Sequence, residues 1–180
     1  MPASPKSDPI QFKPEILAPA GNRLAFLAAI AAGADAVYCG LKSFSARMEA
    51  KNFSLNELVA LTELAHEKGV KVYVALNSLL KSTDLIKPGI LLEQLQNVVA
   101  PDALIMQDLG LIELARQVGF KGELHLSTLT NFSSGAALKH LQRYPQVSRI
   151  VLPRELSIDE VKSIAAGCSE GLRLEIFVHG

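Results

Sequence analysis

The chain has 180 residues, 49% of them hydrophobic, and its 18 acidic residues balance its 18 basic ones. This length suits one ordinary domain or part of a larger one, and the apolar content is typical of a core buried on several faces. The balanced charge provides no global field that would draw the chain to nucleic acid or lipid, although a local basic patch is compatible with it. Two cysteines without metal-ligand spacing argue against a disulfide framework and favour a reducing compartment.

The N-terminal stretch has a different composition from the rest. Three of its first nine residues are proline, and it has no apolar core of the kind that a signal peptide needs. No apolar run anywhere in the chain reaches the length of a transmembrane helix. We therefore expect a disordered leader over residues 1–14, followed by a cytoplasmic domain over residues 15–180 with no membrane partner.

After the leader, the chain repeats one unit, in which a short apolar run precedes a segment of helical periodicity. Seven such runs predict β-strands over residues 16–19, 36–39, 70–76, 103–106, 124–127, 149–152 and 172–178. Several are apolar throughout, which is typical of a parallel sheet covered on both faces. The intervening segments carry signals for six helix starts, namely Asn22, the Ser54 and Ser157 capping boxes, Pro88, Asp108, and Ser133 or Ser134.

Strict alternation of strands and helices predicts right-handed βαβ crossovers and one parallel sheet. A doubly wound, dinucleotide-binding sheet would need a glycine-rich phosphate turn after its first strand, whereas the sequence APAGN at residues 18–22 has a single glycine. A TIM barrel needs eight units, and this chain has about seven strands and six helices. We favour an incomplete TIM-barrel-like α/β fold. Its open edges predict either a missing C-terminal region or self-association through the first and seventh strands.

In such a barrel, functional groups lie at the C-terminal ends of strands and in the loops that follow them. This rule selects eight polar candidates: Asn22, Tyr38, Arg47, Asn77, Ser127, Arg154, Glu155 and His179. Some also have a structural interpretation, because Asn22 suits a helix cap and Arg154 with Glu155 suits a surface ion pair. His179 is the best single candidate for acid–base or ligand chemistry.

The seventh strand adds a ninth candidate. Strict alternation places Glu175, Phe177 and His179 on one face of this strand and aliphatic side chains on the other. The aliphatic face should meet the helices, so Glu175 should point into the barrel, where an unpaired carboxylate is costly. We expect it to find a partner such as Arg149 or His125, either as a structural pair or as an acid in a pocket.

Motifs of the common hydrolases are absent from the sequence. It contains no GxSxG, HExxH or P-loop motif, and its histidines and cysteines are too scattered for a local zinc site. Ser127 and His125 lie two residues apart on one strand face and project in parallel, with no identifiable third member of a triad. We therefore predict no metal ligands and no serine nucleophile.

Eight stretches, in order and at matching spacing, are similar to the N-terminal part of peptidase family U32, the collagenase-like peptidases. They are ILAPAGN (16–22), GADAVYCG (33–40), KNFSLNEL (51–58), AHEKGVKVYVALN (65–77), PDALIMQDLG (101–110), HLSTLTN (125–131), RIVLPRELS (149–157) and EIFVHG (175–180). The resemblance implies catalytic roles for His179, Glu175, Arg154 and Glu155. It implies substrate binding by the five other matching positions: Asn22, Tyr38, Arg47, Asn77 and Ser127.

The resemblance implies two different classes of activity, peptide hydrolysis and hydroxylation. Some relatives are collagenase-like peptidases, whereas others resemble prephenate-dependent hydroxylases of transfer or ribosomal RNA, or hydroxylases of quinone biosynthesis. In the hydroxylases, cysteines downstream of the EIFVHG stretch hold an iron–sulfur cluster. Cys39 and Cys168 do not match those positions, so we expect no cofactor within these residues and a cluster only through cysteines beyond Gly180.

We predict the N-terminal portion of a catalytic domain that is related to RNA or quinone-pathway hydroxylation. A barrel mouth with arginines and amides suits a small anionic molecule or an RNA nucleotide, whereas proteolysis needs a nucleophile or a metal-bound water that we cannot assemble. The alternatives are a collagenase-like peptidase and a truncated domain with no activity of its own.

Overall fold

A computed structural model provides the structure of the chain and describes residues 13–42, 52–80, 85–141 and 143–179. Most of the predicted leader and the candidate Arg47 lie outside the described residues. The described part contains one sheet of seven parallel strands, in the order β1-β2-β3-β4-β5-β6-β7. The strands are β1 (Leu17–Ala20), β2 (Ala36–Gly40), β3 (Lys71–Leu76), β4 (Ala103–Met106), β5 (Glu123–Leu126), β6 (Val147–Val151) and β7 (Arg173–Glu175).

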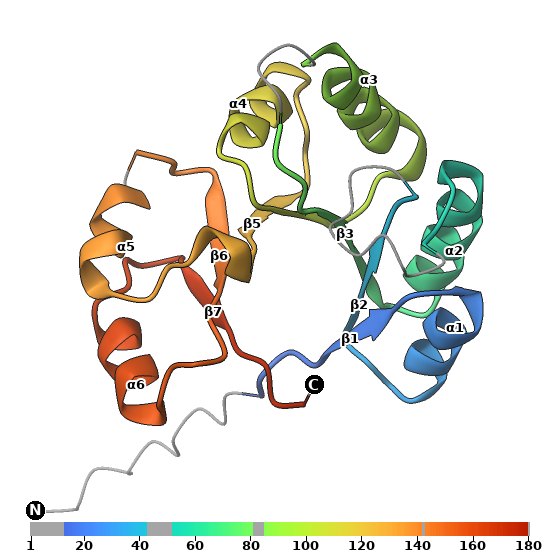
Figure 1. Ribbon diagram of the computed structural model, residues 1–180. Coiled ribbons are helices and arrows are strands. Elements are labelled where there is room, and N and C mark those ends of the chain that lie inside the picture. The colour runs from blue at the N-terminus through green and yellow to red at the C-terminus, as the bar shows by residue number, and fades with distance from the viewer. Residues whose placement is uncertain (1–12, 43–51, 81–84, 142, 180) are drawn as a thin grey trace, which may run out of the picture.

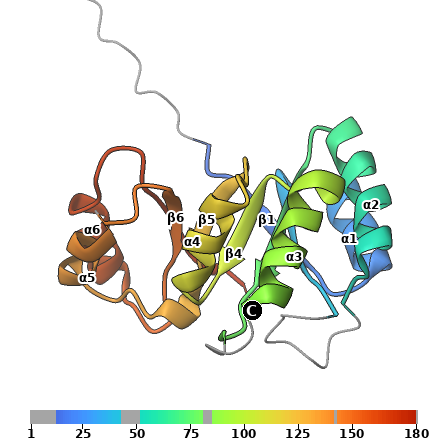
Figure 2. The same cartoon turned by 90° about the horizontal axis from the view of Figure 1, so that it is seen from above.

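Six α-helices cover the outer side of this sheet (Figure 1). They are α1 (Arg23–Ala31), α2 (Leu55–Glu67), α3 (Ile86–Gln94), α4 (Gly110–Gln117), α5 (Gly135–Leu141) and α6 (Ile158–Ala166). In the perpendicular view of Figure 2, α3 and α4 stand in front of the central strands. Because sequential strands are also spatial neighbours, the sheet curls in one direction like part of a barrel. This order confirms the TIM-barrel-like fold and excludes the doubly wound alternative, whose strand order reverses.

The predicted helix starts are confirmed where a side chain caps the helix. Asn22 accepts a hydrogen bond from the backbone N–H of Ala25 at 3.0 Å, and both Ser54 and Ser157 form complete capping boxes. Such caps satisfy backbone donors that the first helical turn leaves without partners. These polar residues therefore position the loops that follow β1, β2 and β6.

Asp108 differs from its predicted role as the cap of the fourth helix. This helix begins at Gly110, and Leu109 occupies its cap position without a side-chain hydrogen bond. One carboxylate oxygen of Asp108 accepts the N–H of Gly110 at 2.8 Å, and the other accepts the N–H of Leu80 at 2.9 Å. Asp108 thus joins the start of α4 to the loop that follows β3.

The sheet separates two apolar layers. The larger layer lies between the sheet and the helices, where Phe26, Leu58 and Leu92 have no exposed surface. The smaller layer fills the inside of the curl with Tyr73 and Ile105 among small alanines. Strand alternation produces this division, because successive side chains point to opposite faces. The small inner layer leaves room at the C-terminal end of the sheet.

The last strand is shorter than predicted. Residues 172–178 were expected to be extended, but β7 spans only Arg173–Glu175. Its neighbour β6 ends at Val151, and the last bond between the two segments runs from the N–H of Leu152 to the carbonyl of Glu175 at 2.9 Å. Beyond Glu175 the described chain pairs with no further residue of β6, so the strand ends there. Within the described residues, no helix is long and apolar enough to cross a membrane.

Candidate functional site

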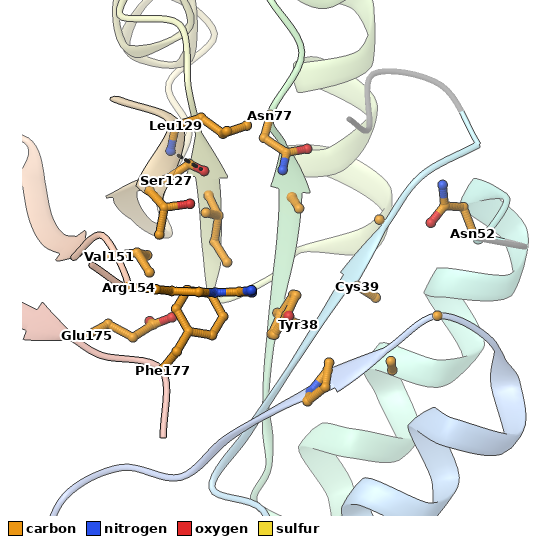
Figure 3. A pocket seen from close by; sticks show the side chains of 17 residues that line it. Tyr38, Cys39, Asn52, Asn77, Ser127, Leu129, Val151, Arg154, Glu175 and Phe177 are labelled. Carbon is orange, nitrogen blue, oxygen red and sulfur yellow. Dashed lines mark hydrogen bonds between the residues drawn. The ribbon is translucent and has the colours of Figure 1, made fainter. Parts of the chain in front are cut away.

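A pocket of about 280 Å³ opens at the C-terminal ends of the strands (Figure 3). Six strands contribute lining residues, and Ser127 adds to the lining directly after β5. The inner layer of the curl closes the pocket from below through Ala75, Ile105 and Val151. The C-terminal face of a parallel barrel is where side chains from many separate segments converge, so the position of this pocket is the one expected of a functional site.

Five of the nine candidates line this pocket: Tyr38, Asn77, Ser127, Arg154 and Glu175. They come from five different segments of the chain, and Figure 3 shows Arg154, Glu175 and Ser127 on the side of β5 to β7, with Tyr38 and Asn77 across from them. Selecting residues at the C-terminal ends of the strands therefore identified a set of side chains that line one cavity. Asn52, which lies between β2 and α2 in the chain, also lines it.

Three of the other four candidates do not line the pocket, and the fourth lies outside the described residues. Asn22 is exposed and caps α1, as its structural interpretation predicted. Glu155 and His179 are exposed and are not lining residues, and Arg47 lies outside the described residues. The alternation predicted for the seventh strand holds for Glu175 and Phe177. It no longer governs His179, because β7 ends before that residue.

Arg154 lies at the mouth of the pocket on an aromatic ring. Its guanidinium carbon is 4.2 Å from the ring centroid of Phe177, a cation–π contact that fixes the orientation of the side chain. Among the residues that the structure describes, Arg154 forms no ion pair, and the predicted pair with Glu155 is not formed. Its planar donors are free to receive an anionic group.

The hydroxyl of Ser127 has no adjacent base in the part of the chain that the structure describes. Its oxygen accepts the N–H of Leu129 at 3.3 Å. The neighbouring His125 instead places Nε2 2.7 Å from Glu123, toward the opposite end of the strand. Burial lowers the pKa of His125 to about 4, so this ring is neutral at neutral pH. The structure thus confirms that these two residues form no nucleophile–base pair.

Cys39 borders the pocket but is not an activated thiol. Its side chain is 2% exposed, and its Sγ lies 3.9 Å from the carbonyl oxygen of Tyr73. Burial raises the pKa of this thiol to about 12, which keeps it protonated. Reactive cysteines have lowered pKa values and electropositive surroundings, so Cys39 is a small core residue.

A network of charged side chains lies inside the curl, next to the pocket. Arg149 places Nη1 2.6 Å from a carboxylate oxygen of Glu15 and 3.4 Å from one of Glu175. The hydroxyl of Tyr73 donates to Glu15 at 2.8 Å, and the Arg149 guanidinium lies 5.3 Å from the centroid of the Tyr73 ring. Of the two partners expected for Glu175, Arg149 or His125, the structure pairs it with Arg149.

The sequence analysis did not identify Glu15 as part of this site. Glu15 and Arg149 are 134 residues apart, and no periodicity links them. One signal was available, since an arginine inside an apolar strand implies a buried acidic partner. Arg149 alone would have predicted such a partner, although not which carboxylate it is.

The described residues do not fit an iron–sulfur cluster. Such clusters are held by several cysteine thiolates, whereas Cys39 is buried in the core and Cys168 follows α6, with its thiol 3.5 Å from the carbonyl of Ile164. Within the described ranges, no three histidine, cysteine or acidic side chains are grouped so that they could hold a metal ion.

Comparison with known proteins gives a family match over most of the chain. The model described as peptidase family U32 matches residues 21–180. An uncharacterized protease of Methanocaldococcus jannaschii is 36% identical over 92% of this chain, and a tRNA hydroxylation protein P of Haemophilus influenzae is 40% identical over 94% of it. A collagenase of Porphyromonas gingivalis is 33% identical over 92% of the chain.

The chain spans 36% to 41% of the length of these three relatives. Among solved structures, the U32 peptidase Mk0906 superposes with a TM-score of 0.76 over 96% of this chain and 72% of its own. At 13% sequence identity, this likeness supports the fold and not the activity.

Proposed function

Because the chain belongs to peptidase family U32, we propose that residues 15–180 form the N-terminal portion of the catalytic domain of an RNA-hydroxylating enzyme. In this proposal, the pocket at the barrel mouth binds an anionic substrate. The observation that carries it is the Arg154 guanidinium, which stacks on Phe177 and has no described ionic partner. Several relatives carry names that refer to tRNA or rRNA modification, and these names support the choice of RNA.

The polar groups around Arg154 fit this role. Asn77, Ser127 and Tyr38 line the same cavity and supply amide and hydroxyl groups. A guanidinium with neighbouring neutral donors is suited to a carboxylate or a phosphate, since hydrogen bonds between charged groups are stronger than neutral ones. Prephenate, which the family resemblance implies as a co-substrate, is a dicarboxylate, and an RNA nucleotide carries a phosphate. Both are anions, and we propose a cytoplasmic location as the one that suits an RNA substrate.

Peptide hydrolysis has less support from this geometry. One relative is named a collagenase, but two of the nucleophilic side chains at the pocket, Ser127 and Cys39, are not activated. Ser127 has no base, because His125 is bound to Glu123, and the Cys39 thiol is held protonated by burial. Nucleophilic catalysis needs a group with a lowered pKa or an adjacent base.

Deletion of the gene, followed by mass spectrometry of digested RNA, tests this proposal. We expect the deletion strain to lose one hydroxylated nucleoside from its transfer or ribosomal RNA and to accumulate the form that lacks one oxygen atom. The wild-type gene and a gene carrying Arg143→Gln should restore it, because Arg143 is an exposed arginine that follows α5 and does not line the pocket. A gene carrying Arg154→Gln should restore little.

Unchanged RNA in the deletion strain, together with cleavage of denatured collagen by the purified protein, would replace this proposal with the peptidase alternative. The prediction that cysteines beyond Gly180 hold an iron–sulfur cluster stays part of the proposal. Anaerobic purification of the gene product, with assays for iron and sulfide, tests that part separately.

A further inference from the structure

Next to the pocket, one guanidinium nitrogen of Arg149 contacts the carboxylates of two glutamates. Nη1 of Arg149 lies 2.6 Å from Oε1 of Glu15 but 3.4 Å from Oε2 of Glu175. Nε of Arg149 is buried and has no hydrogen-bond partner among the described residues, so neither carboxylate is held by a two-pronged pair. The geometry therefore favours Glu15 in a competition for a single cation.

We propose that Glu175 is the proton-exchanging carboxyl of the pocket, and that Glu15 is its positioning residue because it holds the cation that would otherwise neutralise Glu175. The inference rests on the proposed function only in taking this pocket as the substrate site. Glu175 lines the pocket, and Figure 3 shows its carboxyl directed toward Phe177 and Arg154.

Glu15 is held by more groups than Glu175. Besides Arg149, the hydroxyl of Tyr73 donates to its Oε1 at 2.8 Å, and Nζ of Lys71 lies 3.6 Å from its Oε2. Burial acts to raise the pKa of Glu15, but the hydrogen bonds from Arg149 and Tyr73, together with the nearby positive charges, outweigh it and lower the pKa. Glu15 is therefore a fixed negative charge that keeps Arg149 in place.

Glu175 has the opposite balance. Its side chain is 17% exposed and, among the described residues, receives only the long contact from Arg149. Burial raises the pKa of Glu175, the Arg149 charge offsets this only in part, and the negative charge of Glu15 raises it further. A carboxyl with this balance takes up a proton at a higher pH than an ordinary glutamate, while it still faces the cavity.

Among the described residues, the other charged and titratable groups inside the curl do not replace Arg149 as a partner of Glu175. Those on adjoining elements are Arg154 after β6, Tyr38 on β2, Tyr73 and Lys71 on β3, and His125 and Glu123 on β5. Arg173, which lies on β7 together with Glu175, pairs with Glu123. His125 on β5 also pairs with Glu123. Lys71 pairs with Glu15, and Arg154 stacks on Phe177.

This arrangement makes anion binding depend on pH. A protonated Glu175 donates a hydrogen bond to an anionic ligand beside Arg154, whereas an ionised Glu175 repels it. An arginine keeps its charge over this range, so the change comes from Glu175. Affinity for an anion should therefore be high below the Glu175 midpoint and fall as the pH rises through it, by up to about tenfold per pH unit for one linked proton.

Carbon-detected NMR titration of ¹³C-labelled glutamate side chains in the ligand-free protein tests the charge competition directly. Glu175→Gln and Glu15→Gln remove one resonance each and so assign the two signals. In the wild type, Glu175 should titrate above the ordinary range of a glutamate and Glu15 below it. This ordering is measured in the wild type itself, with the variants used only to assign the two signals, and the reverse order would overturn the inference.

The decisive variant is Glu15→Gln, which keeps an acceptor for Arg149 but removes the charge. Arg149 then becomes available to Glu175, so the Glu175 midpoint should fall by about one pH unit or more. Glu123→Gln is the matched control, because Glu123 is a half-buried acid inside the same curl that pairs with Arg173 and His125 and not with Arg149. An unchanged midpoint in Glu15→Gln, or an equal fall in Glu123→Gln, would overturn the inference.

Calorimetric titration with sulfate, whose charge is constant over this range, tests the consequence for binding. Affinity should fall with rising pH in the wild type, and the fall should begin at a lower pH in Glu15→Gln. Sulfate affinity that does not vary with pH would overturn the role of Glu175. Absence of any anion binding would contradict the proposed function, while the NMR midpoints still decide the competition between Glu15 and Glu175.

Discussion

Most charged side chains inside the curl form pairs that join distant segments. Glu15 and Glu175 meet Arg149, and Glu123 meets Arg173 as well as His125 on its own strand. Buried charges are costly unless they are paired, so each pair constrains the strands that carry it. Glu15, which precedes β1, and Arg149 on β6 also connect the start of the sheet to its sixth strand.

His125 should make the folded protein less stable in acid. Unfolded histidine takes up a proton as the pH falls through about 6.5, whereas burial lowers the pKa of folded His125 to about 4. Between these values the unfolded state binds more protons, so stability falls as the pH falls, by at most about 1.4 kcal/mol per pH unit. Urea unfolding at pH 7 and pH 5 should show a smaller acid loss in His125→Gln than in the wild type. Equal losses would contradict this assignment.

The sequence predicted those site residues whose position follows from the local strand pattern. It did not predict residues whose position depends on pairing with a distant segment. Tyr38, Ser127 and Arg154 follow from strand ends, because a curled parallel sheet brings those ends to one face. Glu15 was missed because its partner is 134 residues away. Candidates such as His179 were chosen on the assumption that the last strand extends further than it does.

At the scale of the elements, the two capping boxes were predicted accurately from the sequence, whereas the cap predicted at Asp108 was not. Ser54 and Ser157 form both halves of their capping boxes, because the motif spans only four residues and needs no distant partner. The end of β7 could not be predicted in the same way. An apolar run continues through Val178, but a strand ends where its neighbour ends, and β6 stops at Val151.

Ser157→Ala should destabilise the protein by about 1 kcal/mol through loss of the cap of α6. The hydroxyl of Ser157 bonds to both the backbone and the carboxylate of Glu160, so its removal leaves a helix donor without a partner. Ser163→Ala is the matched control, since Ser163 is exposed within the same helix, where alanine is favourable. Thermal or urea denaturation measures both variants. A loss in Ser163→Ala equal to that in Ser157→Ala would rule out the cap as the cause.

At the scale of the whole molecule, the sheet has two edges. Within the described residues, β1 pairs only with β2, and β7 pairs only with β6. Figure 1 shows no described helix between α6 and α1, on the side where these edges lie. Exposed strand edges present unpaired backbone groups that can bind another chain.

We expect the chain, when purified alone, to self-associate through these edges. Ile16 is 57% exposed immediately before β1, and Ile16→Lys should weaken the association, because a lysine at an edge opposes strand pairing. Leu24→Lys, which places the same charge on the exposed start of α1, should leave it unchanged. Sedimentation velocity over a range of concentrations measures all three proteins. A monomer at every concentration, with cooperative melting, would contradict this expectation.

The account depends most on Arg154 as the anion-binding group of the pocket. Isothermal titration of the purified protein with prephenate at neutral pH measures this role directly. We predict that the wild type and Arg143→Gln bind with equal affinity, and that Arg154→Gln binds at least about tenfold more weakly, as expected for loss of a charged hydrogen bond. Equal binding by Arg154→Gln and the wild type would contradict the assignment of this pocket as the anionic substrate site.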